Sequence, residues 1–68
     1  MLGSRIKELR EGKQLTQIEL ARKLRITQAY LAQLETGARS NPSILLLRKL
    51  AKALKVDLAE LFKEVDHR

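Results

Sequence analysis

The sequence predicts an all-α domain built from five short helices. Of its 68 residues, 44% are hydrophobic, and only one Phe and one Tyr are among them. Strong helix formers dominate, whereas the chain holds only three Gly and one Pro. A chain of this length has room for one small hydrophobic core, so residues 1–68 are expected to form a single domain.

The first two helices are expected on either side of a short polar turn. The first runs from about Leu2 to Glu11, and Gly12 is expected to stop it. The second opens with the letters TQIE, a capping box in which Thr16 caps the helix and Glu19 reaches back. The residues that this second helix is expected to bury are Ile18, Leu20, Ala21 and Leu24.

The remaining three helices are also marked by their ends. The third begins at Thr27, a second candidate N-cap, and ends at Gly37. After the polar loop ARSNP, Pro42 and Ser43 begin a fourth helix in which leucines recur at helical spacing. A fifth helix opens at Asp57 with the capping box DLAE. Its expected core residues are Leu58, Leu61 and Phe62.

The connection between the second and third helices is very short. Only Arg25 and Ile26 separate Leu24 from Thr27. Two helices joined so closely cannot lie antiparallel and must cross at a steep angle, which is the helix-turn-helix geometry. Ile26 is expected to point inward and hold the two helices together.

The third helix has an outward face without charge. An advance of about 100° per residue sorts its residues into two sides. The core side holds Tyr30, Leu31, Leu34 and Glu35, and the outward side holds Gln28, Ala29, Ala32, Gln33 and Thr36. These outward residues could simply be helix formers that tolerate solvent. The other helices, however, crowd their outer faces with charge, as the first does with Arg5, Lys7 and Glu8. A narrow neutral face suits the major groove of DNA, where Gln pairs with adenine and a methyl group packs on thymine.

Glu35 is the only charged residue expected in the third helix, and it falls toward the interior. A buried carboxylate needs a partner. Arg10, near the end of the first helix, is the candidate for a structural ion pair. The alternative role of Arg10 is a contact with a nucleic-acid phosphate.

The charge of the chain favours a polyanionic partner, and nucleic acid is the commonest one. The net charge is +6, with −2 on residues 57–68 and therefore +8 on residues 1–56. A soluble protein with a basic surface and no anionic partner is the plainer alternative. The chain has no Cys, and its N-terminus MLGSRIKELR lacks the apolar run of a signal peptide or membrane span, so a cytoplasmic protein is expected.

Two stretches of the chain resemble a known family. These are LTQIELARKLRITQAYLAQLETG and NPSILLLRKLAKALKVDLAELF, which together cover about residues 3–63. They are similar to the Cro/repressor-type helix-turn-helix family, the class of phage lambda Cro and repressor. The resemblance implies a five-helix, lambda repressor-like domain whose third helix, about residues 27–36, lies in the major groove of double-stranded DNA.

The resemblance also implies a role for individual residues. Gln17, at the start of the second helix, would hold a phosphate through its side chain and the nearby amides. Thr27 begins the reading helix. The residues that would face base edges are Gln28, Ala29 and Gln33, and those that would reach the backbone or the groove wall are Tyr30 and Thr36. Arg39 would contact phosphate, with Ser40 or Asn41 beside it; the alternative is a solvated loop charge. Lys13 and Arg22 are weaker candidates.

Two positions depart from the family pattern. Position 25 is usually Gly because the turn residue tends to take a positive φ, so Arg25 is expected to be strained by about 1 kcal/mol. Position 32 is often Ser, and Ala32 removes a polar contact. The base preference is therefore open.

The expected function is a sequence-specific transcriptional regulator, and specifically a repressor that acts as a homodimer on paired half-sites. Candidate interface residues are Leu45 and Val65. An antitoxin-type protein that binds DNA and also a protein toxin is the alternative. His67 is the sole His and has no second ligand or nucleophile nearby, and the chain has no Gly-rich phosphate loop, so nothing indicates an enzyme, a cofactor, a metal site or a small-molecule substrate. A membrane role is poorly supported, because the apolar faces of the basic helices are needed for the core.

Overall fold

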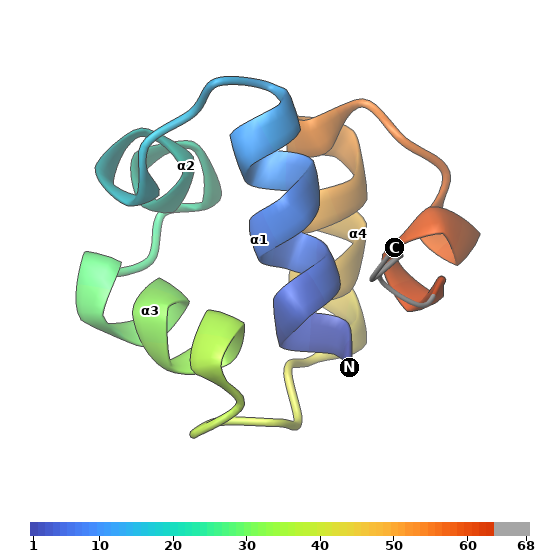
Figure 1. Cartoon of the computed structure of the whole chain (residues 1–68). Coiled ribbons are helices and arrows are strands. Elements are labelled where there is room, and N and C mark those ends of the chain that lie inside the picture. Colours follow the sequence, from blue (N-terminus) through green and yellow to red (C-terminus); the bar gives the residue numbers. More distant parts are fainter. Residues whose placement is uncertain (64–68) are drawn as a thin grey trace.

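The computed structural model describes residues 1–63, in which four α-helices are followed by one short 3-10 helix (Figure 1). In chain order these are α1 (Leu2–Gly12), α2 (Gln17–Leu24), α3 (Gln28–Thr36), α4 (Ile44–Leu54) and η1 (Leu58–Phe62). The predicted all-α class is confirmed for this part of the chain, but the expected fifth α-helix is wrong. None of the helices within residues 1–63 is long and apolar enough to cross a membrane.

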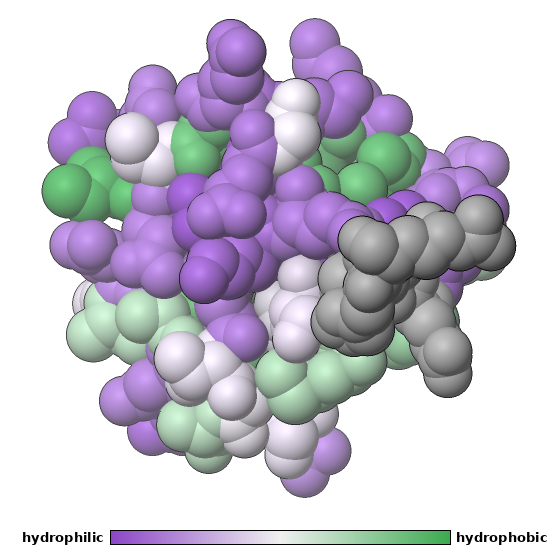
Figure 2. All heavy atoms as spheres, in the orientation of Figure 1, coloured by the Kyte–Doolittle hydropathy of each residue, from purple (hydrophilic) through white to green (hydrophobic). Residues whose placement is uncertain are grey.

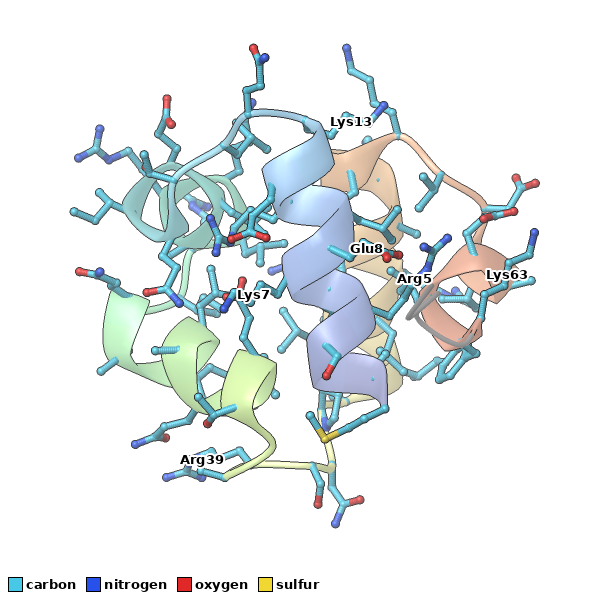
Figure 3. All side chains as sticks on the ribbon, viewed as in Figure 1. Arg5, Lys7, Glu8, Lys13, Arg39 and Lys63 are labelled. Atoms are coloured by element: carbon cyan, nitrogen blue, oxygen red, sulfur yellow. The ribbon has the colours of Figure 1, made fainter. Side chains whose placement is uncertain are left out.

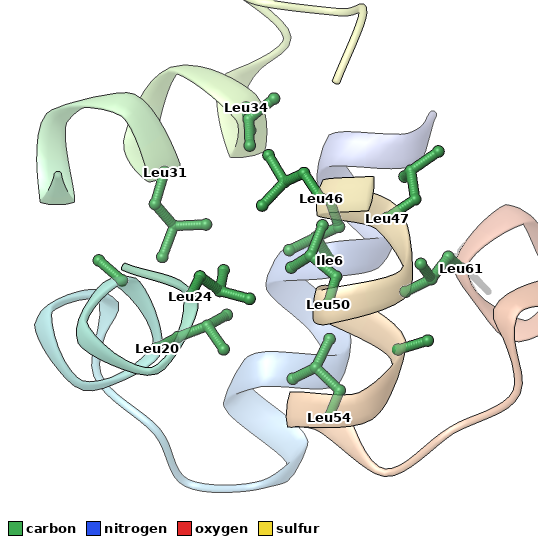
Figure 4. Packing of buried hydrophobic residues seen from close by; sticks show 12 residues of the cluster. Ile6, Leu20, Leu24, Leu31, Leu34, Leu46, Leu47, Leu50, Leu54 and Leu61 are labelled. Carbon is green, nitrogen blue, oxygen red and sulfur yellow. The ribbon is translucent and has the colours of Figure 1, made fainter. Parts of the chain in front are cut away.

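The core is a cluster of aliphatic side chains to which every helix contributes (Figure 4). The side chains that exclude solvent completely or almost completely are Ile6, Leu20, Leu24, Leu31, Leu50, Leu54 and Leu61. Burial of each such side chain contributes about 1.5–3 kcal/mol. Two of the expected core residues are exposed instead, Ile18 by 51% and Phe62 by 58%. Ile18 lies in the first turn of α2.

Helix α1 packs against α3 at very close range because Gly3 has no side chain. A Cβ atom at Gly3 would lie only 2.1 Å from the carbonyl oxygen of Leu34 and 2.7 Å from that of Glu35. The other glycine of α1, Gly12, is the last residue of the helix, and Lys13 is its C-cap. The chain reverses two residues later at Gln14, whose φ is +58°.

Both predicted caps of the helix-turn-helix are confirmed. The Thr16 side chain accepts a hydrogen bond from the Glu19 backbone, and the Glu19 carboxylate accepts one from the Thr16 backbone. The Thr27 side chain accepts a hydrogen bond from the Tyr30 backbone. The turn residue Arg25 has φ +59°, which settles the conformation that the sequence left open. Ile26 is half-buried and packs against the core, as predicted.

The segment expected to be a fifth helix is a 3-10 helix without a side-chain cap at Asp57. It is held from outside by Arg5, which the sequence places among the outer charges of α1. The Arg5 Nε donates a hydrogen bond of 2.8 Å to the Glu60 carbonyl, and Nη2 lies 3.1 Å from the Glu60 carboxylate. Five residues are too few to form a stable α-helix alone, so the tertiary contacts decide its form. Val65 and His67 lie outside the described residues.

Candidate nucleic-acid interface

The exposed side of α3 is the candidate binding face. Within α3 the buried residues are Leu31, Leu34 and Glu35, and Tyr30 is half-buried. The exposed ones are Gln28, Ala29, Gln33 and Thr36, with Ala32 intermediate. This face offers amides, methyl groups and a hydroxyl, and no charge. Figure 2 shows paler residues over α3 at the lower left, beside a strongly hydrophilic band over α1.

An ion pair anchors the inner side of α3 to α1. The Arg10 Nε lies 2.7 Å from the Glu35 Oε2, and Nη2 lies 3.1 Å from Oε1. A third nitrogen of Arg10, Nη1, donates to the Leu15 carbonyl at 2.7 Å. The hydrogen bond with Glu35 raises the pKa of Arg10 further above its usual value. Because Arg10 is only 8% exposed and faces protein acceptors, its guanidinium serves the interior rather than the outer surface.

Gln17 connects this ion pair to the candidate face. Its amide nitrogen donates to the Glu35 Oε1 at 3.0 Å. A carboxylate only accepts hydrogen bonds, so the Gln17 oxygen points the other way and accepts a hydrogen bond from the Gln28 amide at 3.5 Å. The Gln17 side chain is therefore engaged within the protein, while the first-turn N–H groups of α2 have no intrahelical partner.

Arg39 lies beside the C-terminal end of α3 (Figure 3). Its Nε donates to the Gln33 Oε1 at 2.8 Å, and its guanidinium carbon lies 5.5 Å from the centre of the Tyr30 ring. The neighbouring loop residues Ser40 and Asn41 are exposed. The loop after α3 thus places a cation at the edge of the neutral face.

Four further predicted residues are exposed. Lys13 and Arg22 are exposed and make no contact with α3 in the described hydrogen-bond and ion-pair network. Thr27 is exposed, and its hydroxyl oxygen is used as the cap of α3. Leu45 is 62% exposed on α4. Residues 1–63 contain no cluster of His, Cys, Asp or Glu suited to a metal ion.

Sequence reasoning missed Lys7 as a candidate. Lys7 lines a groove together with Gln17 and Thr36, and within residues 1–63 it is the one cationic side chain of a lining that also includes Glu8, Glu11 and Glu35. The signal was available in the spacing of α1. Gly3, Lys7 and Arg10 recur at intervals of four and three residues and therefore share one side of that helix. Gly3 and Arg10 of this side contact α3.

The fold and the exposed face of α3 define a helix-turn-helix domain. Residues 6–61 match a helix-turn-helix family model, and the chain belongs to this family. A relative is the HTH-type transcriptional regulator SinR of Bacillus licheniformis, which is 38% identical over 97% of this chain. The chain spans 60% of the length of that relative.

Solved structures of related proteins have the same fold. SinR in a complex with DNA is 36% identical and has a TM-score of 0.87. The match covers 93% of this chain and 100% of the SinR chain. SinR in a complex with the protein SinI has a TM-score of 0.86 at 35% identity, over 98% of this chain and 69% of that one. The restriction-modification controller protein C.AhdI of Aeromonas hydrophila is 39% identical, with a TM-score of 0.84 over 90% of this chain and 91% of the other.

Proposed function

We propose that this chain is a sequence-specific regulator of transcription that binds double-stranded DNA with α3 in the major groove. The observation that carries the proposal is the exposed, uncharged and hydrogen-bonding face of α3, which Thr27, the Arg10–Glu35 pair and the leucine core hold in place. The relative SinR has been crystallised with DNA in the same fold. The described residues share one core, and the domain itself is proposed as the DNA-binding unit.

The proposed contacts separate base reading from backbone binding. Gln28, Ala29 and Gln33 face base edges, while Thr36 and Tyr30 reach the sugar-phosphate wall of the groove. Arg39 contacts phosphate with its terminal nitrogens. The backbone N–H groups of the first turn of α2, which begins at Gln17, bind a phosphate. Lys7 adds a cation on the side of α1.

Selection of bound sites from random duplex DNA tests this proposal. The wild-type chain is expected to recover a defined site. Gln28→Ala should lose the preference at one base pair of that site, by about 1–3 kcal/mol. Lys52→Ala on α4 is the control and should recover the wild-type site. Recovery of random sequences by the wild-type chain, or an unchanged site with Gln28→Ala, would contradict the assignment of α3.

We further propose repression by a cytoplasmic homodimer that occupies two half-sites about one helical turn apart. The described surface offers exposed apolar residues outside α3, among them Ile44 and Leu45 on α4. Sedimentation at micromolar concentration should give twice the chain mass of 7.8 kDa. A monomer on operator DNA would contradict the paired half-sites.

A DNA-binding protein that also binds a protein partner, such as an antitoxin, is the second candidate function. The same exposed apolar residues, together with Phe62, favour it, and the relative SinR forms a complex with SinI. Copurification of this chain with the product of a neighbouring gene would support this function. Sedimentation of the natural protein as a homodimer with no second chain would count against it.

A further inference from the structure

The last turn of α3 fixes the position of Arg39 relative to Gln33. Gly37 ends the helix with φ +89°. Three donors then converge on the Gln33 carbonyl: the Gly37 N–H at 3.1 Å, the Arg39 N–H at 3.1 Å and the Thr36 hydroxyl at 3.2 Å. The backbone of Arg39 is therefore hydrogen-bonded directly to the residue that its side chain also contacts.

The Arg39 side chain is held at two further points. Its Nε donates to the Gln33 side-chain oxygen at 2.8 Å, and its guanidinium carbon lies 5.5 Å from the Tyr30 ring centre. Tyr30 is three residues before Gln33, so the two side chains are neighbours along the helix. A guanidinium over an aromatic ring is attracted to it, and this contact keeps the planar group beside the Gln33 amide.

The chemistry of the two groups determines which end of the Gln33 amide faces outward. A guanidinium carries donors only, so the Gln33 atom that it meets must be the oxygen. The amide nitrogen and its two hydrogens then point away from Arg39. A free glutamine can turn its amide to offer either a donor or an acceptor, whereas Gln33 in this arrangement offers donors.

Gln28 differs from Gln33 in this respect. Its amide nitrogen meets the Gln17 oxygen at 3.5 Å, which is at the limit of a hydrogen bond. Its oxygen has no partner in the described hydrogen-bond network. Gln28 therefore keeps a free acceptor, and the two glutamines of the face are prepared for different base edges.

We propose that Arg39 is a positioning residue for base recognition, in addition to its phosphate contact. By binding the Gln33 oxygen, it aims the Gln33 amide hydrogens at a base acceptor in the major groove. Guanine offers O6 and N7 there, thymine offers O4, and adenine offers N7 beside its N6 amino donor, whereas cytosine presents only its N4 amino donor. Gln33 thus selects G or T against C. This inference rests on the proposed DNA-binding function.

The experiment compares Arg39→Ala with the wild-type chain on the selected site and on duplexes changed at one base pair each. Gln33→Ala first identifies the base pair that Gln33 reads, as the one whose preference it removes. The wild-type chain should bind G or T at that position at least tenfold better than C, which corresponds to about 1.4 kcal/mol. Arg39→Ala should weaken binding to every duplex and, in addition, reduce this particular discrimination to less than about threefold, a remaining 0.6 kcal/mol or so.

Two further variants separate positioning from a general loss of affinity. In the Gln33→Ala background, Arg39→Ala should weaken all duplexes equally and change no base preference. Gln33→Glu should reverse the preference toward C, because the carboxylate can meet Arg39 with one oxygen and a cytosine amino group with the other. Arg48→Ala on α4 is the control of equal charge and should leave every base preference intact.

The outcomes distinguish this inference from the proposed function. If Arg39→Ala weakens binding by one common factor at every position, Arg39 is a phosphate contact only and the inference is wrong. A wild-type preference for C at the Gln33 position would overturn it equally. If the wild-type chain selects no site at all, the proposed function itself fails. Unchanged thermal unfolding of Arg39→Ala ensures that a folding defect is not the cause.

Discussion

Two arginines contact α3 from opposite sides. Arg10 reaches its inner side from α1, is 8% exposed and meets the carboxylate of Glu35. Arg39 reaches its outer side from the following loop, is exposed and meets the uncharged amide of Gln33. The two Nε–O distances are almost equal, at 2.7 and 2.8 Å. The geometry of the two contacts is thus similar, and their surroundings differ.

This difference separates stability from recognition. A buried charge that loses its partner is strongly destabilising, because water cannot replace the lost hydrogen bonds. An exposed arginine that loses its partner is simply solvated. The inner pair is therefore expected to determine whether α3 is held in place, and the outer pair only what α3 presents to DNA.

The largest expected effect comes from breaking the inner pair. Arg10→Met leaves the buried Glu35 carboxyl group without its cationic partner and with Gln17 as its remaining side-chain donor, and should lower the free energy of unfolding by about 3–5 kcal/mol. Arg39→Met should change it by less than about 0.5 kcal/mol, as exposed substitutions usually do. Urea unfolding of both variants measures the comparison. Equal stabilities would show that the inner pair is no more important to the fold than the outer one.

A double substitution identifies the cause of that loss. In Arg10→Met with Glu35→Leu no charge remains buried, so most of the lost stability should return. Recovery of stability in the double variant would show that the unpaired Glu35 carboxylate causes the loss in Arg10→Met. A double variant as unstable as Arg10→Met alone would indicate that the packing of the arginine stem matters instead.

The two faces of α3 also differ in how far the sequence could predict them. Helical periodicity placed Glu35 inside and left Arg10 as its candidate partner, because an acid on a buried face has few alternatives. The contact of Arg39 with Gln33 spans a loop whose path depends on the left-handed Gly37, so spacing along a helix says nothing about it. The 3-10 form of η1 could not be predicted from the sequence either. This segment is contacted by Arg5, which is distant in sequence and reads as an ordinary surface charge.

A second prediction concerns Gly37, on which the outer arrangement depends. Gly37→Ala places a Cβ at a positive φ and only 3.0 Å from the Met1 sulfur, and should cost about 1–2 kcal/mol. Gly12→Ala is the matched control, because a Cβ there meets nothing within 4 Å. Because Gly12 is the last residue of α1, the substitution should stabilise the helix by at most about 0.5 kcal/mol. Thermal unfolding should therefore move in opposite directions for the two substitutions; a parallel shift would contradict the requirement for glycine at 37.

A third prediction compares the two N-caps of the helix-turn-helix. Thr16→Ala and Thr27→Ala should each cost about 1 kcal/mol. Only the first cap includes a titratable group. This group is the Glu19 carboxylate. The hydrogen bond from the Thr16 backbone lowers the pKa of Glu19 below the ordinary value of 4.5, and the Thr16 side chain makes the second-largest contribution to this decrease.

The pH dependence of the two caps should therefore differ. Because the pKa of Glu19 is lower in the folded state, its ionised form stabilises that state above the ordinary pKa. This contribution is lost as the pH falls through the lowered pKa. The stability difference between the wild type and Glu19→Gln should thus be constant near pH 7 and change below about pH 5. The stability difference between the wild type and Thr27→Ala should stay constant over the same pH range. If it also changes below about pH 5, a group other than Glu19 causes the pH dependence.

The smallest expected effect lies in the turn between α2 and α3. Arg25 has φ +59°, a conformation that costs an ordinary residue about 1 kcal/mol or more and costs glycine almost nothing. Its backbone N–H bonds to the Arg22 carbonyl, and glycine at this position would keep that bond. Arg25→Gly should raise the free energy of unfolding by up to about 1 kcal/mol, while Arg22→Gly inside α2 should lower it by a similar amount. If both substitutions destabilise alike, the Arg25 side chain makes contacts that offset its backbone strain. Arg25 would then contribute to the stability of the fold, as Arg10 does on the inner side of α3.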